Sequence, residues 1–283
     1  MRTKVLVTGA KGQLATTIKD FFSNNQDGID FTFVSKQDLD ITNPNILNAF
    51  FKVNKFKYCI NCAAYTNVEQ AEKTPQTALA INALGVKNLA EVCLQSSCIL
   101  IHISTDYVFD GKKNAPYKET DTPNPINAYG KSKLQGEQFI QSILKEYFII
   151  RTSGLYSRYG KNFFKTIVKK INEEQELKVI NDQTTAPTSC IELTRFIYFL
   201  IKTNQKNFGI FHFSASGEAS WYDFAKEISN HFNYKLIYPV SSAQFPSKVN
   251  RPKSSVLDNN KAQLIFGNIK TWESGLNDVL MAM

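Results

Sequence analysis

The chain has 283 residues, of which 43% are hydrophobic and 20% charged, the composition of an ordinary soluble globular protein. Its net charge of +8 comes from 28 lysines and 5 arginines without long basic runs, which favours a solvated surface or a polyanionic small molecule over nucleic-acid binding. No apolar run approaches 18 residues and the five cysteines have no framework spacing, so we expect a reduced cytoplasmic protein that does not span a membrane.

A glycine-rich turn follows the first predicted strand, residues 4–8. Gly9 and Gly12 are spaced Gly-x-x-Gly-x-x-Ala, with Ala15 where a third glycine is usual. A helical pattern comes next, and the backbone N–H groups at such a helix N-terminus bind phosphate groups. The turn therefore predicts dinucleotide binding, although a plain tight turn would show the same pattern.

The second predicted strand ends in Ser35 and Lys36, where an NAD enzyme often has a carboxylate for the ribose 2′-hydroxyl. A hydroxyl and an ammonium suit a 2′-phosphate, so the pattern favours NADP over NAD. The alternative is that Lys36 is an ordinary surface residue and that Asp38 or Asp40 binds the ribose. Asp40 and Ile41 are expected in a loop near the adenine.

The third predicted strand runs through Ile60 to the small residues Ala63 and Ala64, which allow a flat cofactor to approach the backbone. Cys59 and Cys62 lie in the same apolar run. Residues three apart in a strand point to opposite faces, so we interpret both cysteines as packing residues and predict no metal site.

Two polar residues interrupt apolar stretches further along the chain. Asn82 lies on the apolar face of a helix predicted over residues 77–94, which indicates a side chain that hydrogen-bonds inward. His102 lies on the fourth predicted strand, residues 99–103, and we interpret it as a packed residue rather than a catalytic base.

That fourth strand ends in Ser104, Thr105 and Asp106, at the edge where open parallel sheets bind their ligands. Tyr129 and Lys133 follow, four residues apart at the start of a helical pattern and hence on one helix face. An ammonium beside a phenol lowers the pKa of the phenol. We therefore predict that Tyr129 donates a proton to a carbonyl and that Thr105 is a second hydrogen-bond donor to the same oxygen.

The four-residue spacing alone is weak evidence, because Tyr198/Lys202 and Tyr222/Lys226 repeat it. Only the pair at 129 and 133 follows a strand that ends in Ser-Thr-Asp. The other two pairs are interpreted as ordinary helix neighbours.

Strands and helices alternate regularly up to residue 153, which predicts an α/β fold with a doubly wound, Rossmann-like parallel sheet. We assign residues 1–153 to a dinucleotide-binding domain. Residues 154–283 are expected to form mainly a smaller substrate-binding domain, with some segments packing back on the sheet.

Four motifs resemble those of the extended short-chain dehydrogenase/reductases: TGAKGQLA at 8–15, NCAAYTNVEQAE at 61–72, STDYVFDG at 104–111 and YGKSKLQGE at 129–137. Three more, RTS at 151–153, NDQTTAPT at 181–188 and RPKSSVLDNNK at 251–261, narrow the resemblance to the dTDP-4-dehydrorhamnose reductase family. The resemblance covers nearly the whole chain.

The resemblance implies an oxidoreductase that uses NADPH, with NADH as the alternative, to reduce the 4-keto group of a nucleotide-linked 6-deoxy sugar. The expected reaction is dTDP-4-dehydro-L-rhamnose to dTDP-L-rhamnose, in surface polysaccharide precursor synthesis. It also implies cofactor contacts at Gly12, Gln13, Leu14, Asp40, Ile41, Ala63, Ala64 and Tyr65. Lys133 would hold the nicotinamide ribose and depress the pKa of Tyr129, while Thr105 would steady the sugar oxygen. Asp106 would position a sugar hydroxyl, with Arg251 and Lys253 near the diphosphate.

One departure from the family concerns Gly154, which stands where the family usually has a tryptophan that lines the sugar pocket. Either Tyr156 or Phe163 fills the gap, or the pocket is roomier and takes a different 4-keto sugar. An epimerase or dehydratase of the same superfamily and a catalytically silent regulatory subunit of the same fold are the competing functions. A homodimer is compatible with the resemblance, and no metal ligand set carries over.

Overall fold

A six-stranded parallel sheet forms the centre of the protein in the computed structural model, which describes residues 2–23, 28–244, 247 and 249–283. The strand order is β2-β1-β3-β4-β5-β8, which confirms the predicted doubly wound sheet. The strands are β1 (Thr3–Thr8), β2 (Ile29–Val34), β3 (Tyr58–Asn61), β4 (Ile99–Thr105), β5 (Tyr147–Thr152) and β8 (Gly209–His212). The chain reverses its direction of winding between β1 and β3, and ligands of such sheets bind outside the strand ends at this point.

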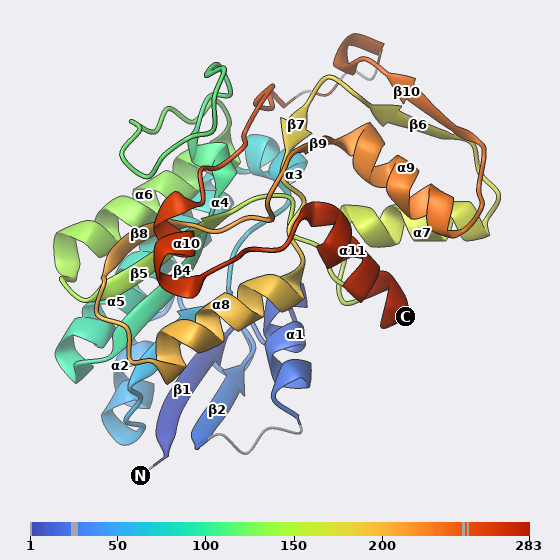
Figure 1. Cartoon of the computed structure of the whole chain (residues 1–283). Coiled ribbons are helices and arrows are strands. Elements are labelled where there is room, and N and C mark those ends of the chain that lie inside the picture. The colour runs from blue at the N-terminus through green and yellow to red at the C-terminus, as the bar shows by residue number, and fades with distance from the viewer. Residues whose placement is uncertain (1, 24–27, 245–246, 248) are drawn as a thin grey trace.

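Helices cover both faces of the sheet (Figure 1). One face carries α1 (Gln13–Phe21), α8 (Cys190–Lys202) and α10 (Asn260–Phe266), and the other carries α2 (Pro44–Val53), α5 (Gly85–Ser96) and α6 (Ala128–Ile143). Alternate strand residues serve the two cores: Val5 and Val7 pack in the first and Leu6 in the second. Cys59 belongs to the second core and Cys62 packs against the first, which confirms that both are packing residues.

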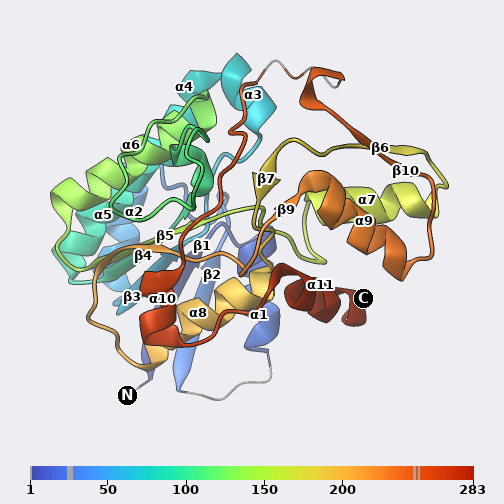
Figure 2. The same ribbon diagram turned by 45° about the horizontal axis from the view of Figure 1, so that its top comes forward.

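A smaller lobe packs beyond the carboxyl ends of the strands (Figures 1 and 2). Its core joins α7 (Phe163–Asn172), α9 (Trp221–His231) and α11 (Trp272–Met281) to the parallel pair β6 (Leu177–Ile180) and β10 (Ile237–Val240). A short antiparallel pair, β7 (Thr184–Thr185) and β9 (Ala219–Ser220), lies between this lobe and the sheet. In this part of the chain the sequence predicts a helix ending near residue 172, helices over residues 191–202 and 221–231 and a strand over residues 210–213, which agree with α7, α8, α9 and β8. It does not predict the four short strands, α10 or α11.

The helix predicted over residues 77–94 is interrupted by a π-helical turn. The segment consists of α4 (Pro75–Leu79), the π-helix η1 (Ala80–Leu84) and α5, preceded by α3 (Val68–Lys73). Asn82 lies in the π turn and bonds the backbone of Tyr65 through both amide atoms, at 2.8 and 3.0 Å, which confirms the inward side chain. The stretch Pro75–Ser96 is long and apolar enough to cross a membrane by composition alone, but half of it is buried inside the protein, so it is weak evidence for a membrane span.

Candidate active site

A cavity of about 530 Å³ opens at the carboxyl ends of the central strands, between the sheet and the smaller lobe. It brings together ten of the residues predicted from the sequence: Gly12, Gln13, Leu14, Ala64, Ser104, Thr105, Asp106, Tyr129, Lys133 and Gly154. These residues come from five separate parts of the chain, so their convergence is a property of the fold. This cavity is the candidate active site.

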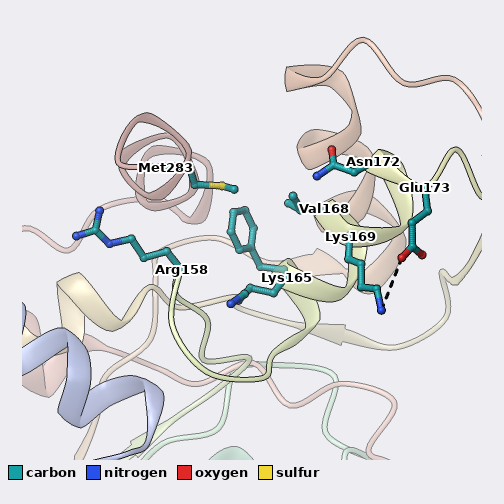
Figure 3. A pocket seen from close by; sticks show the side chains of 8 residues that line it. Arg158, Lys165, Val168, Lys169, Asn172, Glu173 and Met283 are labelled. Atoms are coloured by element: carbon teal, nitrogen blue, oxygen red, sulfur yellow. Dashed lines mark ion pairs between the residues drawn. The ribbon is translucent and has the colours of Figure 1, made fainter.

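A second pocket of about 300 Å³ lies between α7 and the C-terminal residue (Figure 3). Phe164, Val168 and Met283 supply its apolar wall, and Lys165 and the Lys169–Glu173 ion pair lie at its side. None of the predicted site residues lines this pocket. We therefore assign it no role in the chemistry.

The glycine-rich turn brings β1 and β3 into close contact. Gly9 has a φ of +69°, and a Cβ at this position would lie 2.8 Å from the backbone nitrogen of Ala63. Gly12 precedes α1 without a side-chain cap, so the first N–H groups of this helix have no side-chain partner at the cavity wall. Such groups bind phosphate oxygens.

The residues predicted near the adenosine end lie outside the cavity wall. The Ser35 hydroxyl donates to the Asp38 carboxylate at 2.7 Å, and Lys36 is exposed and pairs with Asp40 at 3.8 Å. Ile41 is buried in the second core. The sequence analysis missed Lys11, which lines the cavity and donates to Gln37 at 3.1 Å.

Tyr129 and Lys133 lie one turn apart on α6, whose start is capped by the side chain of Asn127. Lys133 is buried and Tyr129 is partly buried. Loss of solvation raises the pKa of Tyr129 to about 12 against the opposing hydrogen bond with Thr105. The net lowering of this pKa that the sequence predicted is therefore wrong, because burial outweighs the opposing effects. Lys133 turns instead toward β4, where its Nζ donates to the Ile103 carbonyl at 2.6 Å, and burial lowers its pKa to about 8.

The side chains of Ser104 and Asp106, at the end of β4, have different hydrogen-bond partners. Ser104 turns its hydroxyl into the protein, where it donates to the buried Glu137 carboxylate at 2.5 Å. Asp106 accepts hydrogen bonds from Thr105 at 3.0 Å and from Ser255 at 2.5 Å. Burial raises the pKa of Asp106 to about 6 despite these bonds.

Two aromatic residues from the smaller lobe belong to the cavity wall, to which Gly154 also contributes. Phe163 and Trp221 line the cavity with their ring centroids 4.7 Å apart. Tyr156, the other residue expected to fill the gap, is buried against Phe164 and Phe224 in the smaller lobe and does not line the cavity. The expectation for Tyr156 is therefore wrong, because its ring packs in the core.

Neither Arg251 nor Lys253, the residues expected near the diphosphate, lines the cavity. Arg251 pairs with Glu69 of α3 at 2.9 Å, while its neighbours Pro252 and Ser255 form part of the wall. An ion-pair partner 182 residues away cannot be recognised from local sequence.

Thr152 at the end of β5 is a site residue that sequence reasoning missed. Its side chain lines the cavity, and its buried hydroxyl has no hydrogen-bond partner among the described residues. A buried hydroxyl without a partner is costly unless a ligand satisfies it. The RTS motif at 151–153 was the available signal.

The family profile described as "RmlD substrate binding domain" matches residues 3–283, nearly the whole chain. The chain belongs to the RmlD family. Among its relatives, dTDP-4-dehydrorhamnose reductase of Aggregatibacter actinomycetemcomitans is 34% identical, with 98% of each chain covered. The spore coat polysaccharide biosynthesis protein SpsK of Bacillus subtilis is 35% identical over 98% of this chain and 97% of that protein.

The solved structures of RmlD-family proteins show the same architecture. The crystal structure of dTDP-4-dehydrorhamnose reductase from Bacillus anthracis, in complex with NADP, matches with a TM-score of 0.95 and 38% identity, covering all of both chains. UDP-glucose 4-epimerase of Thermus thermophilus matches with a TM-score of 0.85 but at 16% identity, which shows a shared fold alone.

Proposed function

We propose that the protein reduces the 4-keto group of a nucleotide-linked 6-deoxy sugar, converting dTDP-4-dehydro-L-rhamnose to dTDP-L-rhamnose for surface polysaccharide synthesis in the cytoplasm. The observation that carries this proposal is the cavity in which Thr105, Tyr129 and Lys133 meet the glycine-rich turn. The relatives named dTDP-4-dehydrorhamnose reductase, which match along the full chain, support it.

The cavity fits NADPH, the cofactor of the proposed reaction. The uncapped N–H groups at the start of α1, on Gln13 and Leu14, suit its pyrophosphate. Lys11 in the cavity wall and the exposed Lys36 suit a 2′-phosphate. The free Thr152 hydroxyl offers one more hydrogen bond. When bound, NADPH supplies the hydride for the carbonyl carbon.

Tyr129 is the proton donor of the proposed reaction. Because burial holds its pKa near 12, the phenol stays protonated at neutral pH and can give its proton to the sugar oxygen as negative charge develops. Thr105 directs its hydroxyl to Asp106 and can turn it to the same oxygen as a second donor. Asp106, ionised above a pH of about 6, can accept a hydrogen bond from a sugar hydroxyl.

The substrate side of the cavity belongs to the C-terminal part of the chain. We assign dinucleotide binding to residues 1–153 and mainly sugar-nucleotide binding to residues 154–283. The second part supplies Phe163 and Trp221 to the wall, while β8 and α8 return to the sheet. Arg251, paired with Glu69 and hydrogen-bonded to Tyr107 of the cavity wall, is the proposed partner of the diphosphate.

Lys36→Asp tests the preference for NADPH. We expect the KM for NADPH to rise by more than that for NADH, because NADPH alone carries the 2′-phosphate that Lys36 is proposed to bind and that a carboxylate would repel. Steady-state kinetics with both cofactors measure the change, and Lys55→Asp, the same change at an exposed residue of another loop, is the control. Equal effects on both cofactors would make Lys36 an ordinary surface residue.

Trp221→Ala tests the aromatic wall that replaces the usual tryptophan. A contact of this size is worth about 1–3 kcal/mol, so we expect the KM for the sugar nucleotide to rise about 10- to 100-fold while NADPH affinity is kept. Tyr222→Ala, on the same helix but outside the cavity wall, is the control. Restoring tryptophan at Gly154 is a poor test, because its φ of +52° and the Pro187 Cα at 3.1 Å strain any larger residue.

The decisive experiment follows NADPH oxidation with dTDP-, UDP- and GDP-linked 4-keto-6-deoxy sugars. We expect turnover with dTDP-4-dehydrorhamnose and little with the other nucleotides. Reduction of a UDP- or GDP-linked sugar alone would keep the chemistry and overturn the rhamnose assignment. NADPH binding without reduction of any sugar would favour the regulatory-subunit function instead.

A further inference from the structure

His102 lies directly behind Lys133, in a buried chain of hydrogen bonds that starts at β1. Its Nε2 is 3.1 Å from the Lys133 Nζ, and its Nδ1 is 3.0 Å from the Asn61 Nδ2. All three side chains are at most 2% exposed. This contact was not expected from the sequence, which indicated a histidine that merely packs.

The orientation of Asn61 fixes which imidazole nitrogen carries the proton. The Asn61 Oδ1 accepts from the Thr8 hydroxyl at 2.7 Å and from the Ala63 backbone N–H at 3.2 Å. A backbone N–H can only donate, so the oxygen faces Ala63 and the amide N–H₂ faces His102. The His102 Nδ1 must then accept, which leaves the proton of the neutral ring on Nε2.

This tautomer directs an N–H group at the Lys133 Nζ. A neutral amine accepts that bond with its lone pair and still donates to the Ile103 carbonyl at 2.6 Å. An ammonium has no lone pair, so its N–H groups and the His102 Nε2–H would be two donors facing each other. A charged His102 would still donate from Nε2, and burial and the neighbouring Lys133 keep the pKa of the ring well below its usual value.

We propose that His102 is a positioning residue that, held in one tautomer by Asn61, favours the neutral amine of Lys133 over the ammonium. Its importance for catalysis rests on the proposed reductase function, in which Lys133 acts beside the proton donor. The role itself, setting the protonation state of a buried lysine, can be measured without turnover.

The other groups that face Lys133 act in the opposite direction or are neutral. Glu137, one turn further on α6, and Cys62, after β3, both favour the ammonium, and they oppose the larger effect of burial on the pKa of Lys133. Glu137 is itself compensated by Arg151 of β5 at 2.6 Å. Tyr129, one turn earlier on α6, is protonated at neutral pH.

Two substitutions of Asn61 test the proposal from different sides. Asn61→Ala releases the His102 Nδ1, so the ring can turn its lone pair at Nε2 toward an ammonium. Asn61→Asp, nearly identical in shape, accepts a proton from Nδ1 and leaves Nε2 as an acceptor. Thr8→Val is the matched control, because the Ala63 N–H still holds the amide of Asn61.

Competitive acetylation of lysine amines across pH, read by peptide mass spectrometry, gives the titration midpoint of Lys133 in the whole protein. We expect a midpoint near pH 8 in the wild type and Thr8→Val, and one about one pH unit or more higher in Asn61→Asp and Asn61→Ala. The exposed Lys131 is an internal standard that should not move. The kcat/KM limb at high pH should shift with Lys133.

An unchanged Lys133 midpoint in folded Asn61→Asp would overturn the proposal and leave His102 a packed residue, whatever the enzyme's activity. If the midpoint moves but no sugar nucleotide is reduced, the hydrogen-bond role stands and the proposed function fails. Should Asn61→Ala fail to fold, Asn61→Asp is compared with Asn61→Asp/His102→Phe: the added carboxylate raises the Lys133 midpoint by its charge in both, so only a larger rise with the imidazole present supports the proposal.

Discussion

Tyr129→Phe is expected to lower kcat about 10²- to 10⁴-fold, the contribution that a positioned acid typically makes. The change removes one hydroxyl from a partly buried ring whose raised pKa keeps it protonated at neutral pH, and hence removes the proposed proton donor. The ring itself remains, so the affinity for NADPH, measured by fluorescence titration, should change little. Single-turnover measurements separate the loss from product release.

Tyr107→Phe is the matched control for this variant. Tyr107 lines the same cavity and its ring meets that of Tyr129 edge to face at 5.9 Å, so the change deletes a second phenol hydroxyl beside the first. We expect a much smaller loss of kcat. If the two variants lose the same activity, Tyr129 has no special role and the acid must be sought elsewhere in the cavity.

The sequence predicted the parts of the site whose geometry is set locally. Tyr129 and Lys133 share a face of α6 because one helical turn separates them. Thr105 is the last residue of β4, the strand that α6 contacts. The glycine-rich turn was recognisable because a backbone φ of +69° at Gly9 excludes most other residues. Features set by short sequence spacing or by a backbone conformation that requires glycine can therefore be predicted from a single sequence.

The parts that the sequence did not predict depend on packing between distant segments. Trp221 reaches the cavity from the smaller lobe, and Arg251 is held by Glu69, 182 residues away. The net shift of the Tyr129 pKa was predicted with the wrong sign, because the spacing of two residues says nothing about their burial. The Lys133 amine contacts His102 of β4, and only the fold brings these two residues together.

Glu137→Gln is expected to reduce the free energy of unfolding by about 3–5 kcal/mol, because it leaves a buried guanidinium without its counter-charge. The Glu137 carboxylate accepts from the Arg151 Nη2 at 2.6 Å and from Nε at 3.0 Å, and neither side chain is more than 2% exposed. Arg151 also stacks on the Phe109 ring at 5.2 Å, which fixes its position. Urea denaturation of both proteins measures the difference.

The double variant Glu137→Leu with Arg151→Met distinguishes a lost charge pair from lost packing. It removes both charges, so most of the stability should return if the unpaired arginine is the cause. Glu173→Gln, which breaks the exposed pair with Lys169 at 3.7 Å, is the control and should cost less than about 1 kcal/mol. A loss in Glu137→Gln as small as this would mean that water reaches Arg151. A large loss would identify the pair as the contact that fixes α6, and with it Tyr129 and Lys133, against the sheet.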